Sequence, residues 1–376
     1  MKVFPGLAIL VAALFGPEAI AGPVTLPNDF IVENLQGKTC ARYYAPSRLD
    51  ADMRVVAGIA SVNLSTARTS VTKNDDLQER WVRLLADAYG AAARQDREGA
   101  GKILATISSL AATNAMAGAP TYSYVKNHPC WSNGNRNAPC PRHDFEDAST
   151  TVIAMIISAD LLEEFVTPDQ REILDAYFAK NYSHFIKPLA SDSLQSPGLY
   201  DFSGDGLGVL AYARWTHNSD MAQNELKRRK AFLIKVISPD GYIDNNSYRG
   251  YRNYWYHTMG TEVALGYALV ARSYGQDFFA DPKLGPRLRA VAERSVAGGL
   301  DPTLFPSLPA RGDNAYRDPA DTITGVHQMS VSLPLMMKQE YGMTLPLDAR
   351  YKQLSQSETI DRFIGFRADC YYSSQG

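Results

Sequence analysis

The sequence predicts an all-α fold made of antiparallel helix pairs. Apolar residues recur at helical spacing along most of the chain, as in Leu77, Trp81 and Leu84. Strand-like alternation is scarce, and only 26–32 and 53–57 are candidates for short extended pieces. Polar loops rich in Gly, Pro, Asn and Asp separate roughly ten predicted helices. Successive helices over this length favour an α/α toroid or a large helical bundle.

Individual helices follow from periodicity and end signals. The residues from 103 to 111 form an apolar face, and 150–165 is apolar nearly all round, which is typical of a buried helix. Thr167-Pro168-Asp169-Gln170 has the pattern of a capping box with proline at the first helical position, so a helix should run to about Tyr182. Further helices are predicted at 205–215, 221–237, 256–274, 286–297 and 326–341.

The first 21 residues have the pattern of a cleavable secretory signal. Lys2 supplies a positive start, the run 3–15 is apolar, and Ala19-Ile20-Ala21 is a small-x-small cleavage site. The apolar run is too short for a membrane helix. Because no linker or composition break divides residues 22–376, we expect one domain there. We expect the mature protein to be soluble and exported to a bacterial periplasm or beyond.

The four cysteines are Cys40, Cys130, Cys140 and Cys370. An even number in an oxidising compartment indicates two disulfides. Cys130 and Cys140 flank a short polar loop, which favours a local bridge and would leave Cys40 and Cys370 to join the two ends of the chain. Four cysteines allow three pairings, and the sequence alone does not choose among them. Neither CxxC nor HxxxH spacing supports a metal site, so we expect no metal and no cofactor.

Charge and composition limit the classes of ligand that the protein is expected to bind. With 38 basic and 40 acidic residues, the formal net charge is −2, which argues against attraction of the whole chain to nucleic acid or to an anionic membrane. The chain has 21 tyrosines. Tyrosine suits sugars, because its ring stacks on a pyranose face while its hydroxyl forms hydrogen bonds. We expect a monomer whose substrate is a polysaccharide, and residues 240–257 predict that this polysaccharide is acidic.

Most of the candidate chemistry lies in one segment, 240–257, which reads DGYIDNNSYRGYRNYWYH. It combines guanidinium, amide, phenol and imidazole groups, which could together hold a carboxylated sugar and move a proton on it. An apolar-periodic helix follows, so Tyr256 and His257 should lie in its first turn. Because a helix N-terminus favours anions, the segment could form a pocket for a uronate carboxylate.

The order Arg-Gly-x-Arg-x-x-x-Tyr-His at residues 249–257 resembles the alginate lyase family of polysaccharide lyases. The preceding Asp240-Gly241 turn, the chain length and the helix-rich pattern also agree with that family. The specific similarity covers residues 240–275. The resemblance implies an incomplete (α/α) toroid and cleavage of a uronic-acid polymer by β-elimination.

β-Elimination removes the C5 proton of a uronate and expels the C4 oxygen. It needs a group that neutralises the carboxylate, a base and an acid. The resemblance implies that Arg249 neutralises the carboxylate and that Tyr256 acts as base, acid or both. Free tyrosine has a pKa of about 10, so a nearby cation such as Arg249 would help it act as a base. His257 is a further catalytic candidate.

One part of the family pattern is missing. The family has an Asn-His pair at a helix start before the arginine, whereas residues 198–206 of this chain read GLYDFSGDG. A protonated aspartic acid could replace the amide if burial raises its pKa, and Asp201 is our candidate. The departure widens the predicted substrate to alginate (polymannuronate) or a glucuronate-containing exopolysaccharide.

Six further residues are predicted to bind substrate, through charge, amide groups, imidazole or aromatic stacking. They are Arg252, Asn246, Tyr254, Trp255, Arg311 and His143. Each also has a structural interpretation. The arginines could form surface ion pairs, the asparagine could form a turn, and the aromatic residues could fill the core.

Two other functions remain open at this point. A glycoside hydrolase would need two carboxylic acids around the bond, and Asp201, Asp205 and Asp240 are available. A non-catalytic protein that binds glycan or assists exopolysaccharide secretion would fit the missing Asn-His pair. Ultraviolet-absorbing unsaturated products indicate the lyase, reducing ends without that absorbance indicate the hydrolase, and binding without cleavage indicates the third function.

Overall fold

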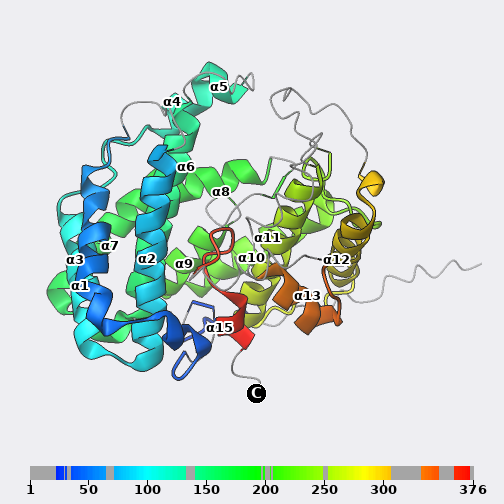
Figure 1. Cartoon of the computed structure of the whole chain (residues 1–376). Coiled ribbons are helices and arrows are strands. Elements are labelled where there is room, and N and C mark those ends of the chain that lie inside the picture. The colour runs from blue at the N-terminus through cyan, green and yellow to red at the C-terminus, as the bar shows by residue number, and fades with distance from the viewer. Residues whose placement is uncertain are drawn as a thin grey trace, which may run out of the picture.

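The computed structural model describes residues 23–28, 30–31, 35–64, 72–132, 140–195, 198–199, 204, 206–248, 253–305, 332–346 and 360–372. Within these ranges the regular structure is helical (Figure 1), apart from one isolated antiparallel bridge between Ile237 and Ile243. The predicted all-α class is therefore confirmed. Closure of the helices into an incomplete toroid stays a prediction, and the predicted signal peptide lies outside the described residues.

The first half of the fold contains eight of the labelled α-helices. They are α1 (Pro46–Ala57), α2 (Thr72–Arg94), α3 (Arg97–Ala112), α4 (Tyr122–Asn127), α5 (Pro129–Ser132), α6 (Pro141–Leu161), α7 (Pro168–Asn181) and α8 (Lys187–Ser193). A π-helical turn, Tyr182–Ile186, joins α7 to α8. Helix α2 packs on α6, and α3 packs on α1 and α7.

The second half carries the candidate site. Its described helices are α9 (Leu207–Trp215), α10 (Ser219–Val236), α11 (Asn253–Ser273), α12 (Gly285–Leu300), α13 (Leu333–Tyr341) and α15 (Ala368–Tyr372). Helix α9 packs between α6 and α10, and α11 packs on α12 and α13. In Figure 1, α11 and α12 lie on the opposite side of the molecule from α1, α2 and α3.

Two predicted elements need correction. Residues 53–57 are not extended but belong to α1, because Leu49, Met53 and Val56 are spaced to bury one helical face. The buried helix predicted at 150–165 already begins at Pro141 and ends at Leu161. Its polar first turns hid the start from a search for apolar residues.

The capping box before α7 is confirmed. The Thr167 hydroxyl accepts a hydrogen bond from the Gln170 amide nitrogen, and the Gln170 side chain accepts one from the Thr167 amide nitrogen. Pro168 occupies the first helical position, where no amide hydrogen is needed. Short polar signals of this kind fix a helix end without reference to the rest of the fold.

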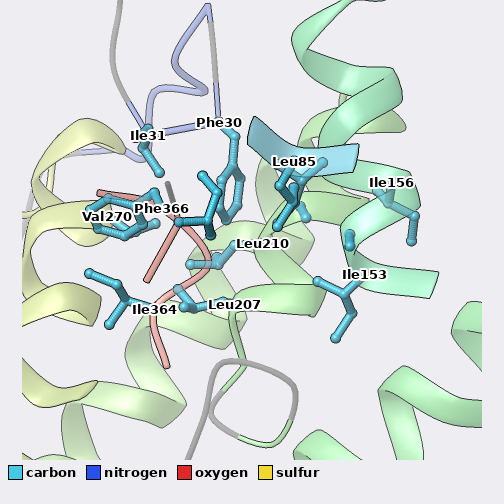
Figure 2. Packing of buried hydrophobic residues seen from close by; sticks show 14 of the residues in the cluster. Phe30, Ile31, Leu85, Ile153, Ile156, Leu207, Leu210, Val270, Ile364 and Phe366 are labelled. Carbon is cyan, nitrogen blue, oxygen red and sulfur yellow. The ribbon is translucent and has the colours of Figure 1, made fainter. Parts of the chain in front are cut away.

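The apolar core joins segments that are far apart in sequence. Figure 2 shows Phe30 and Ile31 beside Phe366, with α9 contributing Leu207 and Leu210. The inner face of α6 adds Ile153 and Ile156, and all of these side chains are buried. The core is therefore complete only when both ends of the chain pack onto the central helices.

Two disulfides are present, Cys40–Cys370 and Cys130–Cys140. The first joins positions 330 residues apart, and the Arg42 guanidinium lies 2.5 Å from the Asp369 carboxylate beside it. The second closes a local loop before α6. Both pairings agree with the arrangement favoured by the sequence. Among the described residues, no helix is both long and apolar enough to cross a membrane.

Candidate functional site

The site begins with a tight reversal of the chain after α10. The Gly241 amide donates to Ser238 O at 3.0 Å, and the Asp244 amide donates to Val236 O at 2.8 Å. Gly241 has a φ of +85°, and a Cβ there would lie 2.2 Å from Ala290 O of α12. Only glycine satisfies both conditions, so the predicted Asp-Gly turn is confirmed and brings the segment 242–248 against α11 and α12.

Asn246 is buried behind this turn. Its Nδ2 donates to Leu199 O at 2.6 Å and to Tyr256 O at 2.8 Å, and its Oδ1 accepts from the Leu199 amide at 2.9 Å. The side chain has no exposed surface. Instead of presenting its amide to solvent, Asn246 links the segment before α9 to the start of α11.

His257 is also fully buried, and its hydrogen bonds determine its tautomer. Nε2 lies 3.3 Å from Val291 O of α12, and because a carbonyl only accepts, Nε2 carries the hydrogen. Nδ1 then accepts from the Ser247 hydroxyl at 2.9 Å, while Ser247 Oγ accepts from the Ile243 amide at 2.8 Å. Burial, with a smaller contribution from the charge of Arg294, lowers the pKa of His257 to about 3. The imidazole is neutral and holds the turn against both helices.

Tyr254 points into the contact between α11 and α12. Its hydroxyl donates to Ser295 O at 2.8 Å, and its ring packs edge-on against Phe305 at 5.4 Å. A Cβ at Gly298 would lie 2.8 Å from the Tyr254 ring, so the glycine leaves room for it. Burial raises the pKa of Tyr254. Its surroundings are those of a packed tyrosine with a satisfied hydroxyl.

Trp255 and Tyr256 are the partly exposed residues of the first turn of α11. Their rings meet edge to face at 4.4 Å. The Tyr256 carbonyl accepts a hydrogen bond from Asn246, and the Tyr256 side chain is partly exposed. Of the predicted residues in this turn, these two remain accessible to a polymer.

His143 lies in the first turn of α6, on another helix. Its side chain is 47% exposed, and Nδ1 lies 3.5 Å from Glu146 Oε2. Arg142 Nε bonds the same glutamate at 2.7 Å. The ion-pair partner of His143 is therefore a residue of the same helix, and the exposed imidazole remains accessible to a ligand.

Four predicted site residues lie outside the described residues. They are Arg249, Arg252, Asp201 and Arg311. Among the residues that are described, no group of His, Cys, Asp and Glu is arranged to hold a metal ion.

The structure also reveals residues that the sequence analysis did not single out. Ser247 orients His257, Phe305 packs against the imidazole at 4.8 Å, and Gly260 gives Asn246 its space. A Cβ on Gly260 would lie 2.8 Å from Asn246 Nδ2. These contacts join residues 10 or more positions apart, so helical spacing gave no signal for them.

Comparisons with known proteins bear on this region. Residues 204–305 match the family model described as "Alginate lyase". No curated protein matched the sequence. Among solved structures, alginate lyase A1-III, in a tyrosine-to-phenylalanine variant complexed with tetrasaccharide, aligns with 12% sequence identity and a TM-score of 0.49, over 86% of this chain and 95% of that one.

The family match covers the helices that carry the candidate site. It begins just before α9 and ends at Phe305, so it includes the turn at Gly241, the buried Asn246 and His257, and Tyr256 at the surface. The resemblance first suggested by residues 249–257 thus extends across this whole region. Residues 204–305 are similar to the alginate lyase family model, and this similarity supports a polysaccharide lyase.

Proposed function

We propose that this protein cleaves a uronic-acid-containing glycan by β-elimination. The observation that carries the proposal is the position of Tyr256, which lies within the family match and is partly exposed in the first turn of α11. The substrate is alginate (polymannuronate) or a glucuronate-containing exopolysaccharide. We place the reaction in the periplasm or outside the cell, which suits a chain with two disulfides.

In the proposed reaction, the Tyr256 oxygen takes the C5 proton of the uronate, and the electron pair left behind expels the C4 oxygen. A C4–C5 double bond forms as the C4–O4 bond breaks. The leaving oxygen takes a proton, which Tyr256 supplies when proton and leaving group lie on the same face of the sugar. Correctly placed acid and base catalysis is worth about 10² to 10⁴ in rate.

Arg249 is our candidate for the carboxylate. A guanidinium beside the uronate stabilises the negative charge that develops as the proton leaves, since its paired N–H groups match the two carboxylate oxygens. Arg249 precedes Tyr256 by seven positions, as in the family pattern that the sequence resembles. Asp201, if protonated, would add a hydrogen bond to the same carboxylate.

The remaining predicted residues fall into two groups. Trp255 and His143, which are at least partly exposed, stay candidates for contact with the polymer, as do Arg252 and Arg311, which lie outside the described residues. The buried side chains of Asn246, Tyr254 and His257 make hydrogen bonds to the backbone or to Ser247, so we assign them to holding the site in place.

The test is ultraviolet absorbance of the unsaturated product. Purified protein is incubated with polymannuronate, polyguluronate, glucuronan and a glucuronate-containing bacterial exopolysaccharide. We expect absorbance to rise on at least one polymer, and Tyr256→Phe to lower the rate by about 10²-fold or more, because it loses the group that moves the proton.

Tyr124→Phe is the matched control, because that hydroxyl belongs to an exposed tyrosine on α4, outside the family match. It should leave the rate unchanged. Reducing ends without absorbance would instead indicate a hydrolase, and binding without either product would contradict catalysis. A rate unchanged in Tyr256→Phe would overturn the role of Tyr256 while keeping the lyase.

A further inference from the structure

Asn246 uses nearly all of its hydrogen-bonding capacity on the main chain of two separate segments. Both of its N–H groups are used, one on Leu199 O and one on Tyr256 O, and its carbonyl accepts the Leu199 amide. An asparagine amide has two donors and one acceptor oxygen, so one lone pair is left. Because the residue is also fully buried, it has nothing to offer a substrate directly.

The two segments are parts of the proposed site. Tyr256 is the proposed base and acid, and Leu199 comes two residues before Asp201 in the stretch where the family pattern departs. Asn246 holds Leu199 by both its N–H and its C=O, which fixes the direction of the main chain as well as its position. The third hydrogen bond, to Tyr256 O, connects Leu199 through Asn246 to the start of α11.

We propose that Asn246 is a positioning residue that sets the distance between Leu199 and the start of α11, which carries Tyr256; this inference rests on the proposed β-elimination. In the reaction, the proton acceptor and the carboxylate-neutralising group of the protein must both reach the same sugar ring. A displacement of 1 Å between such groups can cost about 10² in rate. A fixed distance between the backbone at Leu199 and the backbone at Tyr256 should therefore affect the rate of the reaction.

The neighbours of Asn246 leave it no other position. A Cβ at Gly260 would lie 2.8 Å from both Asn246 Nδ2 and Ile243 Cδ1, so the amide rests directly on the helix backbone. With its second donor on the carbonyl of the first helical turn, the side chain is locked in rotation. The amide therefore joins Leu199 to α11 in one fixed orientation.

A buried ion pair lies close to the start of α9. Gly206, at the start of α9, has a φ of +93°, and a Cβ there would lie 2.2 Å from Glu225 Oε1. Glu225 is buried and pairs with Arg229 at 3.2 Å. Arg229 in turn donates to Ala190 O at 3.1 Å. Leu199 and Gly206 therefore each meet a buried polar side chain.

A residue that only stabilises the fold would behave differently from a positioning residue. Losing it would lower the melting temperature, yet the protein that remains folded would turn over normally. Losing a positioning residue lowers kcat in the folded protein and changes KM little, because binding contacts survive while the reacting groups are misplaced. The ratio of the two effects separates the roles.

The test measures kcat, KM and melting temperature for Asn246→Asp, on the polymer that the wild-type protein cleaves. Aspartate keeps the shape but replaces the two donors with an oxygen that faces two carbonyls. We expect kcat to fall by about 10²-fold, with KM changed less than about threefold, at a temperature where circular dichroism shows the variant folded. Asn246→Ser, which leaves a single hydroxyl donor on a shorter side chain and introduces no charge, serves if Asn246→Asp does not fold.

Asn181→Asp is the matched control. Asn181 is buried, and its Nδ2 donates to Tyr177 O at 2.8 Å within α7, away from the site. It should lose stability but keep its kcat. The inference is overturned if the folded Asn246 variants keep wild-type kcat, or lose no more of it than the Asn181 variant does. If wild-type protein yields no unsaturated product from any polymer, the proposed function fails, and this inference fails with it.

Discussion

At the scale of single residues, the direction of each side chain in the first turn of α11 decides its role. Tyr256 and His257 are neighbours in sequence, but successive helical residues are rotated by about 100°. Tyr256 therefore stays at the surface, while His257 enters the contact with α12. The sequence predicts both residue types and the helix start, but which of them points inward depends on α12, which lies 30 residues further on.

The burial of Asn246 shows a similar limit. Its paired asparagine, Asn245, has a φ of +62°, which fits a turn-forming residue and could be expected from the local sequence. One hydrogen-bond partner of Asn246, in contrast, is Leu199, 47 residues earlier. A contact between residues so far apart produces no periodic pattern in the sequence. Only the folded structure shows that the Asn246 amide bonds to the main chain inside the protein.

The neutral His257 predicts a stability that depends on pH. Its pKa is about 3 in the folded protein but about 6.5 when unfolded. Between these values the unfolded chain binds a proton that the folded protein does not. The free energy of unfolding should therefore fall by about 1 kcal/mol for each pH unit below 6.5, and this contribution is fully present above that pH.

Urea unfolding of wild type and His257→Gln at pH 7 and pH 5 checks this. The glutamine variant should lose less stability between the two pH values, because its amide can bond Val291 O and Ser247 without titrating. His143→Gln removes an exposed imidazole and serves as the control. Equal losses in wild type and His257→Gln would contradict the assignment of the acid sensitivity to His257.

At the scale of helices, Gly208 of α9 allows a close approach between α9 and α6. A Cβ at Gly208 of α9 would lie 2.5 Å from Ile153 Cδ1 of α6 and 2.9 Å from Ile186 Cγ2. Alanine normally stabilises a helix relative to glycine by about 1 kcal/mol. At this position the extra methyl must displace buried side chains, so packing should outweigh propensity.

Two substitutions compare these effects. Gly208→Ala should lower the free energy of unfolding by about 1–3 kcal/mol through overpacking. Gly101→Ala, in α3, meets nothing within 4 Å of the new Cβ and should raise it by about 0.5–1 kcal/mol. Denaturant unfolding measures both, and a stabilising Gly208→Ala would show that α6 and α9 separate easily.

The helices themselves were largely predictable from sequence, whereas their ends were less so. The cap at Thr167 and the turn at Gly241 are encoded by adjacent residues, and both were found. The apolar pattern does not predict the start of α6, because its first turns are polar. They include Arg142 and His143, which both pair with Glu146. Apolar spacing locates the buried part of a helix and overlooks a polar extension.

At the scale of the whole molecule, the two ends of the chain stabilise the fold together. Arg214 of α9 donates to Pro27 O at 2.6 Å, and the Thr25 amide donates to Tyr274 O at 3.2 Å. At the other end, the Tyr372 hydroxyl donates to Glu340, which also forms a paired salt bridge with Arg272. Since the apolar core is continuous across these segments, we infer that the described residues form one domain.

The two disulfides should differ in their contribution to stability. Constraining a longer loop removes more entropy from the unfolded chain, so loss of Cys40–Cys370 should cost about 2–5 kcal/mol, and loss of Cys130–Cys140 less. Paired substitutions, Cys40→Ala with Cys370→Ala and Cys130→Ala with Cys140→Ala, isolate each bridge. Thermal unfolding should show the larger decrease for the first pair, and the reverse order would contradict the loop-length argument.

The separation of Cys40 from Cys370 also constrains how the protein can be made. Cys40 emerges first and must wait for 330 further residues before its partner exists, while Cys130 and Cys140 appear in between. In a compartment that oxidises thiols, the unpaired Cys40 thiolate can attack one sulfur of the Cys130–Cys140 disulfide, which forms a mixed disulfide and releases the other cysteine as a thiolate. A second thiol–disulfide exchange reverses this step. Any such mispairing has to be exchanged before Cys40 can bond Cys370, and uncatalysed disulfide reshuffling takes on the order of seconds to hours.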